Sequence, residues 1–582
     1  MNWMGCFGLD RHELARIFNE LGVLLELQGE NPFKSRAYYN AARTLENLSG
    51  DLAGLVQTNG LAEIPGFGPA IIKKIAEWVE TGTIRYYEDL RSQTPAGLLE
   101  LLGVPGLGPR KISQIHSALG VTNLEELERA CHSNQLAGLS GFGAKTQEKI
   151  CAGIQFLKEH RGEYLLFEAL NLGLMLRERL AAHPLVQRVE LAGSCRRFKE
   201  TVKDLDLVVA STAPETVIQF FNTQPEVIQV VASGGTKSSV TLKTGINADL
   251  RVVALAEFPH VLQHFTGSKD HNTALRHLAK QQGYKVNEYG LFRDEARIDC
   301  RDEAEIYQTL GFSYIPPELR EDLGELEAAA NGQLPVLVQP EDLKGLFHIH
   351  TTASDGTNSL REMVEAAIAR GYTYLGVTDH SQAAVYAHGL TPERLRMQAA
   401  EIERLSREYP GFRIFRGIEA DILGNGALDY TPEILAEFDF VIGSVHSQFK
   451  LTPAEMTARI LKAMDSPYLT MLGHPTGRIL LGRPGYELDL EAVLIKAVER
   501  RIIVEFNANP YRLDLDWRWS RRAKLLGVMT AINPDAHAVS ELDLARSCLS
   551  IARKGWLEAQ DVLNTRTTEE VAAYFQGRRD DR

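Results

Sequence analysis

The sequence predicts a multidomain protein of mixed class, with a helical N-terminal part, an α+β middle and an α/β barrel at the C-terminus. Three observations lead to this prediction. A chain of 582 residues is too long for one hydrophobic core. A Gly-hydrophobic-Gly motif recurs between helical segments in the first third of the chain. After residue 341, short apolar runs that read as strands alternate with helical segments, as in a barrel of parallel strands.

The composition limits the class of protein. Hydrophobic residues make up 44% of the chain and charged residues 24%, as in ordinary globular proteins. Because no apolar run approaches the length of a membrane span and the N-terminus lacks a signal-peptide pattern, we expect a cytoplasmic protein without a membrane partner. The six cysteines include no Cys-x-x-Cys pair, which argues against a disulfide framework and fits a reducing cytosol. They are Cys6, Cys131, Cys151, Cys195, Cys300 and Cys548.

The net charge does not identify the partner. The value of −13, from 63 basic and 76 acidic residues, by itself disfavours nucleic-acid binding. Metal-binding carboxylates would inflate this count, and bound cations would cancel part of it. The motifs must therefore decide which partner the protein binds.

The repeated motif of the first third predicts contact with a nucleic-acid backbone. Its two glycines permit positive φ and close backbone approach, so amides at the start of the following helix can face a phosphate oxygen. Such contacts do not read sequence. One copy could be a plain helix–helix turn, but three copies favour DNA binding, although the third has Ser140 where the others have proline. The glycines are Gly66 and Gly68, Gly106 and Gly108, and Gly141 and Gly143.

These motifs resemble helix-hairpin-helix motifs. With helices expected at 13–27, 32–48 and 51–58, residues 1–95 are similar to the small amino-terminal domain of family X DNA polymerases. Lys34, Lys73 and Lys74 lie on or near the expected DNA face. The resemblance implies that Lys74 can form a Schiff base with a 5′-deoxyribose phosphate. A nucleophilic lysine needs a lowered pKa, which the sequence does not reveal, so a phosphate-contacting lysine is the alternative.

Three carboxylates in the middle of the chain predict a two-metal site. Asp204 and Asp206 are two residues apart in an apolar run that reads as a strand, so both side chains point to one face. Asp249 lies in another strand pattern. An Asp-x-Asp pair alone reads as two solvated acids, but three carboxylates on adjacent strands can hold two divalent ions.

A Gly-Ser turn before this strand predicts a triphosphate site. Gly193 and Ser194 offer amides and a hydroxyl at a strand-to-helix turn, and Arg197 adds a charge-assisted contact. Together with the three aspartates, the turn resembles the nucleotidyltransferase palm of polymerase β. The resemblance implies Mg²⁺ or Mn²⁺ at the aspartates, and makes Asp249 the candidate base for the primer hydroxyl.

The segment from His264 to Asn272 resembles the nucleotide-binding segment of family X polymerases. By this resemblance, Phe265 and Gly267 contact the sugar, Asn272 contacts the minor-groove edge of the base, and Arg276 faces the template strand. His264 replaces the usual aromatic residue before Phe265, and Lys269 replaces an acidic one. These departures leave sugar discrimination open.

Histidines and acids after six strand-like runs predict a multinuclear metal centre in the C-terminal part. A lone histidine at a strand end is more often a hydrogen-bonded core residue, but this pattern recurs. Imidazoles and carboxylates together suit divalent transition metals that generate hydroxide near neutral pH. The set is His348, His350, Asp355, His380, Glu419, His446, His474, Asp535 and His537.

This ligand set resembles that of the PHP (polymerase and histidinol phosphatase) family across about residues 341–575. The resemblance implies a distorted (βα)7 barrel, phosphoester hydrolysis and up to three ions, for which Mn²⁺ or Zn²⁺ is expected. Seven strand-like runs can be counted if 502–506 is included. The implied ligand groups are His348, His350, Glu419 and Asp535; Glu419, His446 and His474; and Asp355, His380 and His537.

The sequence as a whole predicts a gap-filling repair DNA polymerase of family X with 3′–5′ exonuclease activity in its PHP domain. The expected partners are gapped or primer–template DNA and dNTPs. A DNA-targeted small phosphoesterase and a non-catalytic DNA-end-binding scaffold are the alternatives. The predicted domains are 1–95 (helical, with the first hairpin), 96–160 (further hairpins), 161–255 (palm), 256–317 (nucleotide selection), 318–340 (a solvated linker with room for one short helix) and 341–575 (barrel).

Overall fold

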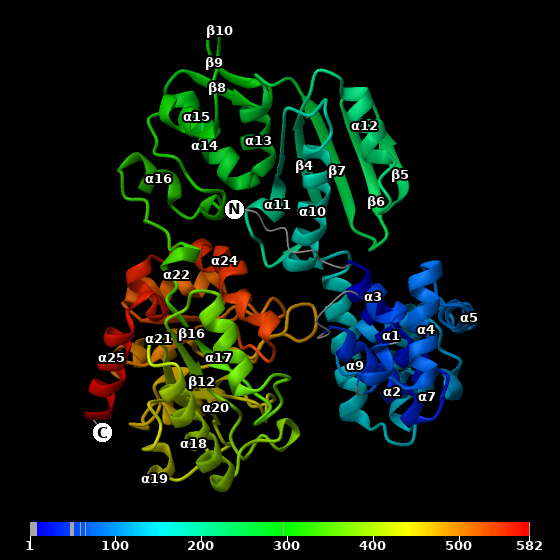
Figure 1. Cartoon of the computed structure of the whole chain (residues 1–582). Coiled ribbons are helices and arrows are strands. Elements are labelled where there is room, and N and C mark those ends of the chain that lie inside the picture. Colours follow the sequence, from blue (N-terminus) through cyan, green and yellow to red (C-terminus); the bar gives the residue numbers. More distant parts are fainter. Residues whose placement is uncertain (1–8, 47–51, 59, 65, 295, 581–582) are drawn as a thin grey trace. The chain divides into compact units, whose positions relative to one another are not determined.

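A computed structural model of the chain describes residues 9–46, 52–58, 60–64, 66–294 and 296–580. The described residues form two compact units, with the boundary between Arg161 and Gly162 (Figure 1). The expected helix start at Asp51, the hairpin proline Pro65 and Cys6 lie outside the described residues. No helix among the described residues combines the length and the hydropathy that a bilayer crossing needs.

The first unit is helical, as predicted, with α1 beginning earlier than expected, at Leu9. Leu21, Tyr38 and Ile75 belong to one hydrophobic cluster of this unit, and Ile112 and Ile154 to another. The helices are α1 Leu9–Leu27, α2 Pro32–Glu46, α3 Leu52–Gln57, α4 Pro69–Thr81, α5 Arg85–Gln93, α6 Ala96–Glu100, α7 Pro109–Leu119, α8 Leu124–His132 and α9 Ala144–Glu159, with 3-10 turns η1 Gly60–Glu63, η2 Leu101–Gly103 and η3 Leu136–Gly138.

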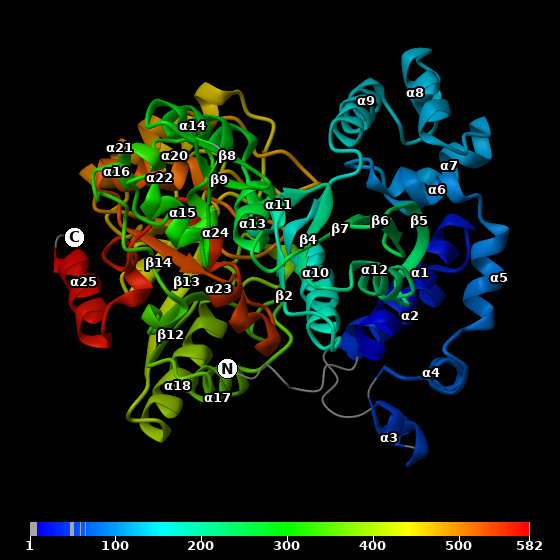
Figure 2. The same ribbon diagram turned by 90° about the horizontal axis from the view of Figure 1, so that it is seen from above.

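The second unit begins with a mixed sheet in the order β2-β4-β7-β6-β5, in which β4 and β7 are parallel and the other pairs antiparallel. Helices α10 and α12 lie against one face (Figure 2). Leu205 and Leu207 of β4 pack with them, whereas Val208 packs with α13 on the other face. The elements are β1 Tyr164–Leu165, α10 Leu166–Ala181, β2 Arg188–Leu191, α11 Gly193–Arg196, β3 Thr201–Val202, β4 Asp204–Ala210, α12 Pro214–Asn222, β5 Val227–Ser233, β6 Lys237–Leu242 and β7 Asn247–Val253.

A smaller subdomain follows, in which two helices precede an antiparallel sheet of β8, β9 and β10. Leu275, Leu291 and Ile306 belong to its hydrophobic cluster. The elements are α13 Phe258–Thr266, α14 Lys269–Gln281, β8 Tyr284–Asn287, β9 Gly290–Arg293, β10 Ala296–Ile298 and α15 Glu303–Thr309.

The segment 318–340 contains the short helix for which the prediction left room, and its residues 322–324 and 330–333 are exposed as predicted, but other residues of the segment are buried. Arg320 and Glu325 are completely buried. Composition predicts solvation because it counts the acids without their partners: Glu325 accepts from His271 Nδ1 at 2.6 Å, and Glu318 from Arg553 Nε at 2.8 Å. The elements are η4 Pro317–Leu319, α16 Glu325–Ala330 and η5 Pro340–Asp342.

The C-terminal part is the predicted barrel. Within the fully described stretch 341–575, seven parallel strands follow one another in chain order, and a bridge between Ile349 and Ala536 nearly closes the ring. The strands are β11 Gly345–Ile349, β12 Tyr374–Val377, β13 Arg413–Asp421, β14 Phe440–Ser444, β15 Met471–Leu472, β16 Ile503–Asn507 and β17 Thr530–Asn533.

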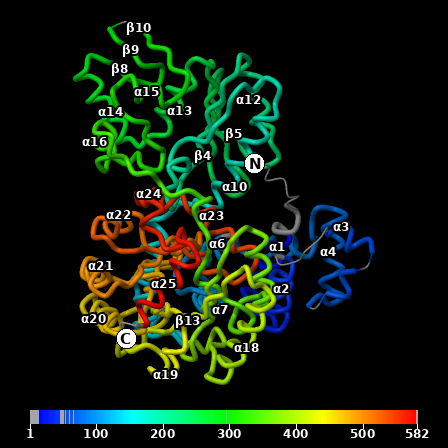
Figure 3. Tube along the Cα trace, turned by 60° about the vertical axis from the view of Figure 1, so that its left-hand side comes forward, coloured from blue at the N-terminus to red at the C-terminus, as the bar shows by residue number. Residues whose placement is uncertain are grey.

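Helices surround these strands (Figure 3). One hydrophobic cluster joins the barrel to the mixed sheet, because it contains Leu205 and Val209 of β4 together with Trp517 and Ile551. The helices are α17 Leu360–Ala369, α18 Pro392–Glu408, α19 Pro432–Leu435, α20 Pro453–Ala463, α21 Leu490–Glu499, α22 Trp517–Leu526, α23 Leu544–Ser547, α24 Leu549–Lys554 and α25 Thr568–Asp580, with η6 Val385–Ala387, η7 Val539–Asp543, η8 Ala559–Asp561 and η9 Leu563–Thr565.

Candidate functional site

The three aspartates of the middle part share one face of the mixed sheet. Asp204 and Asp206 have the same strand parity as Val208 and therefore point to the α13 side. Asp206 stands directly opposite Asp249 on the parallel strand β7. Burial, then Asp204 and Asp249, raise the pKa of Asp206 to about 7. A divalent cation would relieve this repulsion, so the three carboxylates fit a metal site.

Gly193 lets the backbone approach these carboxylates closely. Its φ is +61°, and a Cβ on it would collide with Oδ2 of Asp206. The amide of Ala192 also donates to the backbone oxygen of Asp206 at 2.8 Å. The turn that contains Gly193 and Ser194 is therefore held beside the three carboxylates.

Arg197 is buried and links this turn to the segment from His264 to Asn272, for which nucleotide binding is predicted. Its Nη1 donates to the Thr266 carbonyl at 2.5 Å, and its Nε donates to Oε1 of Glu321 at 3.1 Å. Gly267, with a φ of +69°, follows directly, and a Cβ there would lie 3.1 Å from Nη1 of Arg197. The predicted triphosphate and sugar contacts are thus neighbours in space, although Glu321 already neutralises Arg197.

The other residues of the nucleotide-binding segment contact protein groups. The Cζ atom of Arg251 lies over the Phe265 ring, 4.9 Å from the ring centroid. Asn272 donates to the His264 carbonyl at 2.7 Å and accepts from Gln263 at 2.8 Å. Arg276 lies beside the His264 imidazole, with Nη2 3.3 Å from Nδ1. In this arrangement the Asn272 amide ties α13 to α14.

The nine residues of the barrel gather at the C-terminal ends of its strands, with Glu419 at their centre. Oε1 of Glu419 lies 3.2 Å from His348 Nε2, 3.0 Å from His474 Nε2 and 3.3 Å from His446 Nε2. Oε2 lies 2.9 Å from His380 Nδ1. A carboxylate among four imidazoles is suited to bridge metal ions.

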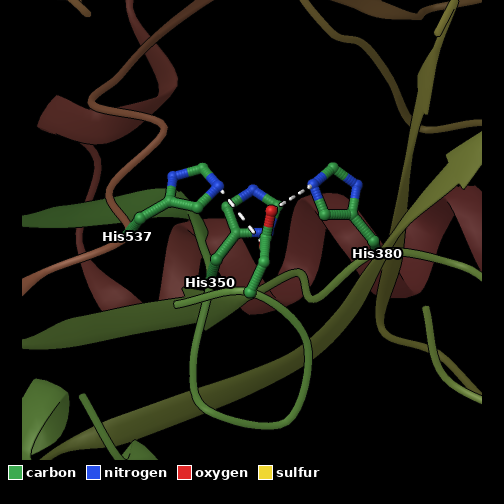
Figure 4. Close-up of side chains that lie close together, drawn as sticks. His350, His380 and His537 are labelled. Carbon is green, nitrogen blue, oxygen red and sulfur yellow. Dashed lines mark ion pairs between the residues drawn. The ribbon is translucent and has the colours of Figure 1, made fainter. Parts of the chain in front are cut away.

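The donor atoms form groups that could hold metal ions. His348, His350 and Asp535 form one group, and His350 joins Asp355, His380 and His537 in another, whose histidines converge in Figure 4. Glu419 pairs with His348 and His474 in one further group and with His380 and His446 in another. The structure thus brings all nine residues together, but His446 and His474 fall into separate groups.

Buried atoms at this centre lack hydrogen bonds. Although some of them lie near an oppositely charged atom, both ring nitrogens of His350, Nε2 of His348, Nδ1 of His380 and Oε2 of Glu419 have no partner with hydrogen-bond geometry among the described residues. Leaving such groups without partners is costly in a folded protein, so the donor set fits metal ions.

The sequence alone did not identify the residues that hydrogen-bond to the candidate metal ligands. Glu505, completely buried in β16, accepts from His348 Nδ1 at 2.6 Å and from the His474 amide at 2.7 Å. Asp421 lies 2.7 Å from His446 Nδ1. In the palm-like sheet, the Ser239 hydroxyl donates to Asp249. An acid inside the apolar run 502–506 was the available signal for Glu505, because a buried carboxylate needs a partner.

The open side of the centre carries a cation, Arg512, and the exposed aromatic ring of Tyr386, which lies beside His380 and His446. Asp355 and His537 are about one-third exposed, whereas His348 and His350 are completely buried. Nε of Arg512 lies 3.5 Å from Oδ2 of Asp535. These residues mark an exposed side of the centre.

In the first unit, the second helix of each hairpin begins directly after its second glycine. Gly68, Gly108 and Gly143 are the N-caps of α4, α7 and α9, and a glycine cap has no side chain to cover the first amides. The first glycines have φ values between 78° and 94°, which other residues rarely adopt. They are Gly66, Gly106 and Gly141.

Lys74 lies on α4 against two tyrosines. Its Nζ is 4.7 Å from the ring centroid of Tyr86 and 5.8 Å from that of Tyr38. Burial is the largest cause that lowers the pKa of Lys74, and the neighbouring Lys34 and Lys73 lower it further. This is the direction that a nucleophilic lysine needs.

Comparison with known proteins agrees with this organisation. Residues 10–84 match a helix-hairpin-helix domain, 98–155 a SAM-like helix-hairpin-helix tandem, 261–321 the DNA polymerase beta thumb and 347–507 the PHP domain. A Bacillus subtilis protein named DNA polymerase/3′–5′ exonuclease PolX is 38% identical over 572 residues, which cover 98% of this chain and 100% of that protein.

Two shorter relatives are named probable phosphatases. One, from Caldicellulosiruptor bescii, is 29% identical over 34% of this chain and 80% of its own length. The other, from Clostridium novyi, is 31% identical over 28% of this chain and 64% of its own length. The full-length similarity to PolX, together with the hairpin, thumb and PHP matches, identifies the family: the chain belongs to the family X DNA polymerases that carry a C-terminal PHP domain.

Proposed function

We propose that this polymerase fills gaps in DNA at the Asp204, Asp206 and Asp249 site and removes 3′-terminal nucleotides at the nine-residue centre of the barrel. The observation that best supports two sites is that each donor set is complete within its own sheet. The aspartates lie on β4 and β7, whereas Glu419 and its histidines lie at barrel strand ends.

The ions that suit the two donor sets differ in part. Divalent ions bound there would neutralise charge on the phosphate and, in the barrel, lower the pKa of water. Three carboxylates suit Mg²⁺ or Mn²⁺, because hard cations prefer oxygen ligands. The imidazole-rich barrel suits Mn²⁺ or Zn²⁺, in up to three positions.

At the polymerase site, the protein positions a primer end and a dNTP. Asp249 is the proposed base for the primer 3′-hydroxyl, and the Ser239 hydroxyl fixes its orientation. The Gly193–Ser194 turn and Arg197 would hold the triphosphate. Phe265 and Gly267 would hold the sugar, and Asn272 and Arg276 would face the base pair once released from their protein contacts.

The first unit would bind the backbone of gapped or primer–template DNA through its hairpin amides. Lys74 is the proposed nucleophile for removal of a 5′-deoxyribose phosphate, because its pKa is lowered and two tyrosine rings face its amine. A lysine that only contacts the phosphate remains the alternative for this position.

The cytoplasm is the proposed location. Cys131, Cys151, Cys195, Cys300 and Cys548 are free thiols, as expected in a reducing compartment.

A one-nucleotide-gapped duplex with a labelled primer tests the proposed activities. With dNTPs and Mg²⁺ or Mn²⁺ the primer should lengthen, and without dNTPs it should shorten stepwise from its 3′ end. Binding of the duplex with neither change would remove both proposed activities.

A small phosphoester is the second candidate substrate of the barrel, because two relatives are named probable phosphatases. Release of phosphate from a small monoester, with no shortening of DNA under the same conditions, would favour this substrate.

A further inference from the structure

Lys554 is a completely buried lysine at the end of α24, in the barrel part of the second unit. Its ammonium lies outside the metal centre and points toward the polymerase part. Nζ donates to Oε1 of Glu321 at 2.5 Å, to the Arg197 carbonyl at 3.2 Å and to the Glu318 carbonyl at 3.4 Å. It also lies 4.6 Å from the Trp517 ring centroid. A buried ammonium is tolerated only with such partners.

The Glu321 carboxylate accepts hydrogen bonds from both Lys554 and Arg197. Oε1 of Glu321 accepts from both Lys554 Nζ and Arg197 Nε, and Arg197 Nη1 reaches the Thr266 carbonyl, beside Gly267. Lys554, Glu321 and Arg197 therefore form a chain of three alternating charges. This chain connects the barrel to the proposed triphosphate and sugar contacts. Little water reaches it, since the side chains of Glu321 and Arg197 are each about 10% exposed.

A second contact anchors the same stretch of the polymerase part. Glu200, three residues after Arg197, accepts from the Trp517 indole at 3.2 Å. Its other oxygen lies 3.5 Å from Nη2 of Arg478, and Arg478 Nε donates to the Arg512 carbonyl at 2.9 Å. The turn that follows α11 is thus fixed to the barrel at Arg197 and at Glu200.

We propose that Lys554 is a positioning residue for DNA synthesis, supplied by the domain that carries the exonuclease centre. By sharing Glu321, it reduces the pull of that carboxylate on Arg197, and by holding the Arg197 carbonyl it fixes the end of the Gly193–Ser194 turn. Without the Lys554 ammonium, Glu321 pairs with Arg197 alone. Arg197 is then less available to bind a triphosphate. The inference rests on the proposed role of Arg197 in binding dNTP.

Steady-state single-nucleotide gap filling by the full-length protein tests this inference, with KM and kcat for dNTP measured separately. Lys554→Met should raise the KM for dNTP about tenfold and change kcat less than about threefold, because the loss is one of ground-state positioning. Exonuclease activity of the same preparation should stay within about twofold. An unchanged KM for dNTP would overturn the inference.

Lys524→Met is the matched control. Lys524 on α22 has a similar set of partners, since Nζ donates to Glu558 at 2.6 Å and to the Trp556 carbonyl at 2.8 Å, but these partners lie within the barrel. Its KM for dNTP should equal that of the wild type. An equal rise in KM for both variants would assign the effect to general loosening of the barrel and contradict the inference.

Two further variants separate this inference from the proposed function and from a folding defect. Arg197→Met should itself raise the KM for dNTP; if it does not, the proposed role of Arg197 fails. Lys554→Met with Glu321→Gln removes both charges and leaves no uncompensated buried acid, but it does not restore the contact to the Arg197 carbonyl, so the KM should fall well below that of Lys554→Met without reaching the wild-type value. A double variant as impaired as Lys554→Met alone would overturn the inference.

Discussion

Asp206 on β4 lies directly opposite Asp249 on the parallel strand β7. In this register, two acids about forty residues apart in the chain share one site with Asp204. Burial and the two neighbouring acids raise the pKa of Asp206 to about 7, so the folded sheet holds the carboxylates together against their repulsion. Parallel pairing of β4 and β7 is therefore the structural basis of the proposed polymerase site.

Gly193 should tolerate no side chain. Because a Cβ would collide with Oδ2 of Asp206, Gly193→Ala must displace either the turn or the carboxylate. We expect gap filling to fall by about 100-fold, since small displacements at a reacting centre cost this much. Exonuclease activity should persist. Gly235→Ala is the control, because a Cβ at Gly235 meets open space. Equal activity of the two variants would show that the close approach does not matter.

Glu505 should support the barrel metals without binding them. Glu505→Gln keeps the shape but weakens the hydrogen bonds that orient His348 and His474, so we expect metal affinity or exonuclease activity to fall about 10- to 100-fold. A Mn²⁺ titration of exonuclease activity measures this, with the exposed Glu499→Gln as control. An unchanged Mn²⁺ dependence would exclude the role.

Glu303 should make stability depend on acid pH. Burial alone would raise its pKa, but Arg320 and Arg196 lower it to about 2 from 4.5. Because the folded pKa lies below the unfolded one, the stabilisation is present above pH 4.5 and is lost as the pH falls toward 2. A shift of this size corresponds to about 3 kcal/mol.

Urea unfolding between pH 6 and pH 3 measures the Glu303 contribution. Glu303→Gln should be less stable than wild type at pH 6, and the difference should shrink as the pH falls. Glu305→Gln is the control, since Glu305 pairs with an exposed arginine, Arg301. A difference that stays constant with pH would mean that folding does not shift the pKa of Glu303.

Lys74 should be the residue trapped on abasic DNA. Borohydride reduction of the protein with a 5′-deoxyribose phosphate end should give a covalent adduct that Lys74→Arg abolishes and Lys73→Arg keeps. DNA binding should survive both changes, because each retains the positive charge. An adduct that persists in Lys74→Arg would leave Lys74 as a phosphate contact.

The sequence allowed the barrel strands and their ligands to be predicted because both depend on local patterns. Apolar runs end in His350, His380 or Asp535, and parallel strands bring their carboxyl ends together. The Asp204 and Asp206 pair follows from strand parity in the same way.

Features that depend on distant partners could not be predicted. Glu321 reads as a solvated acid until the fold places Lys554 beside it, and Glu505 reads as a strand residue until His348 approaches. Composition gives the number of charged residues. Whether they are buried depends on pairing with residues more than one hundred positions away in the chain.

Substitutions that disable one proposed active site at a time test the central claim most directly. On the gapped duplex, Asp204→Ala with Asp206→Ala should abolish extension and leave 3′ shortening intact. His350→Ala should abolish shortening and leave extension intact. If either change removes both activities in a folded protein, the two reactions do not occur at separate metal sites.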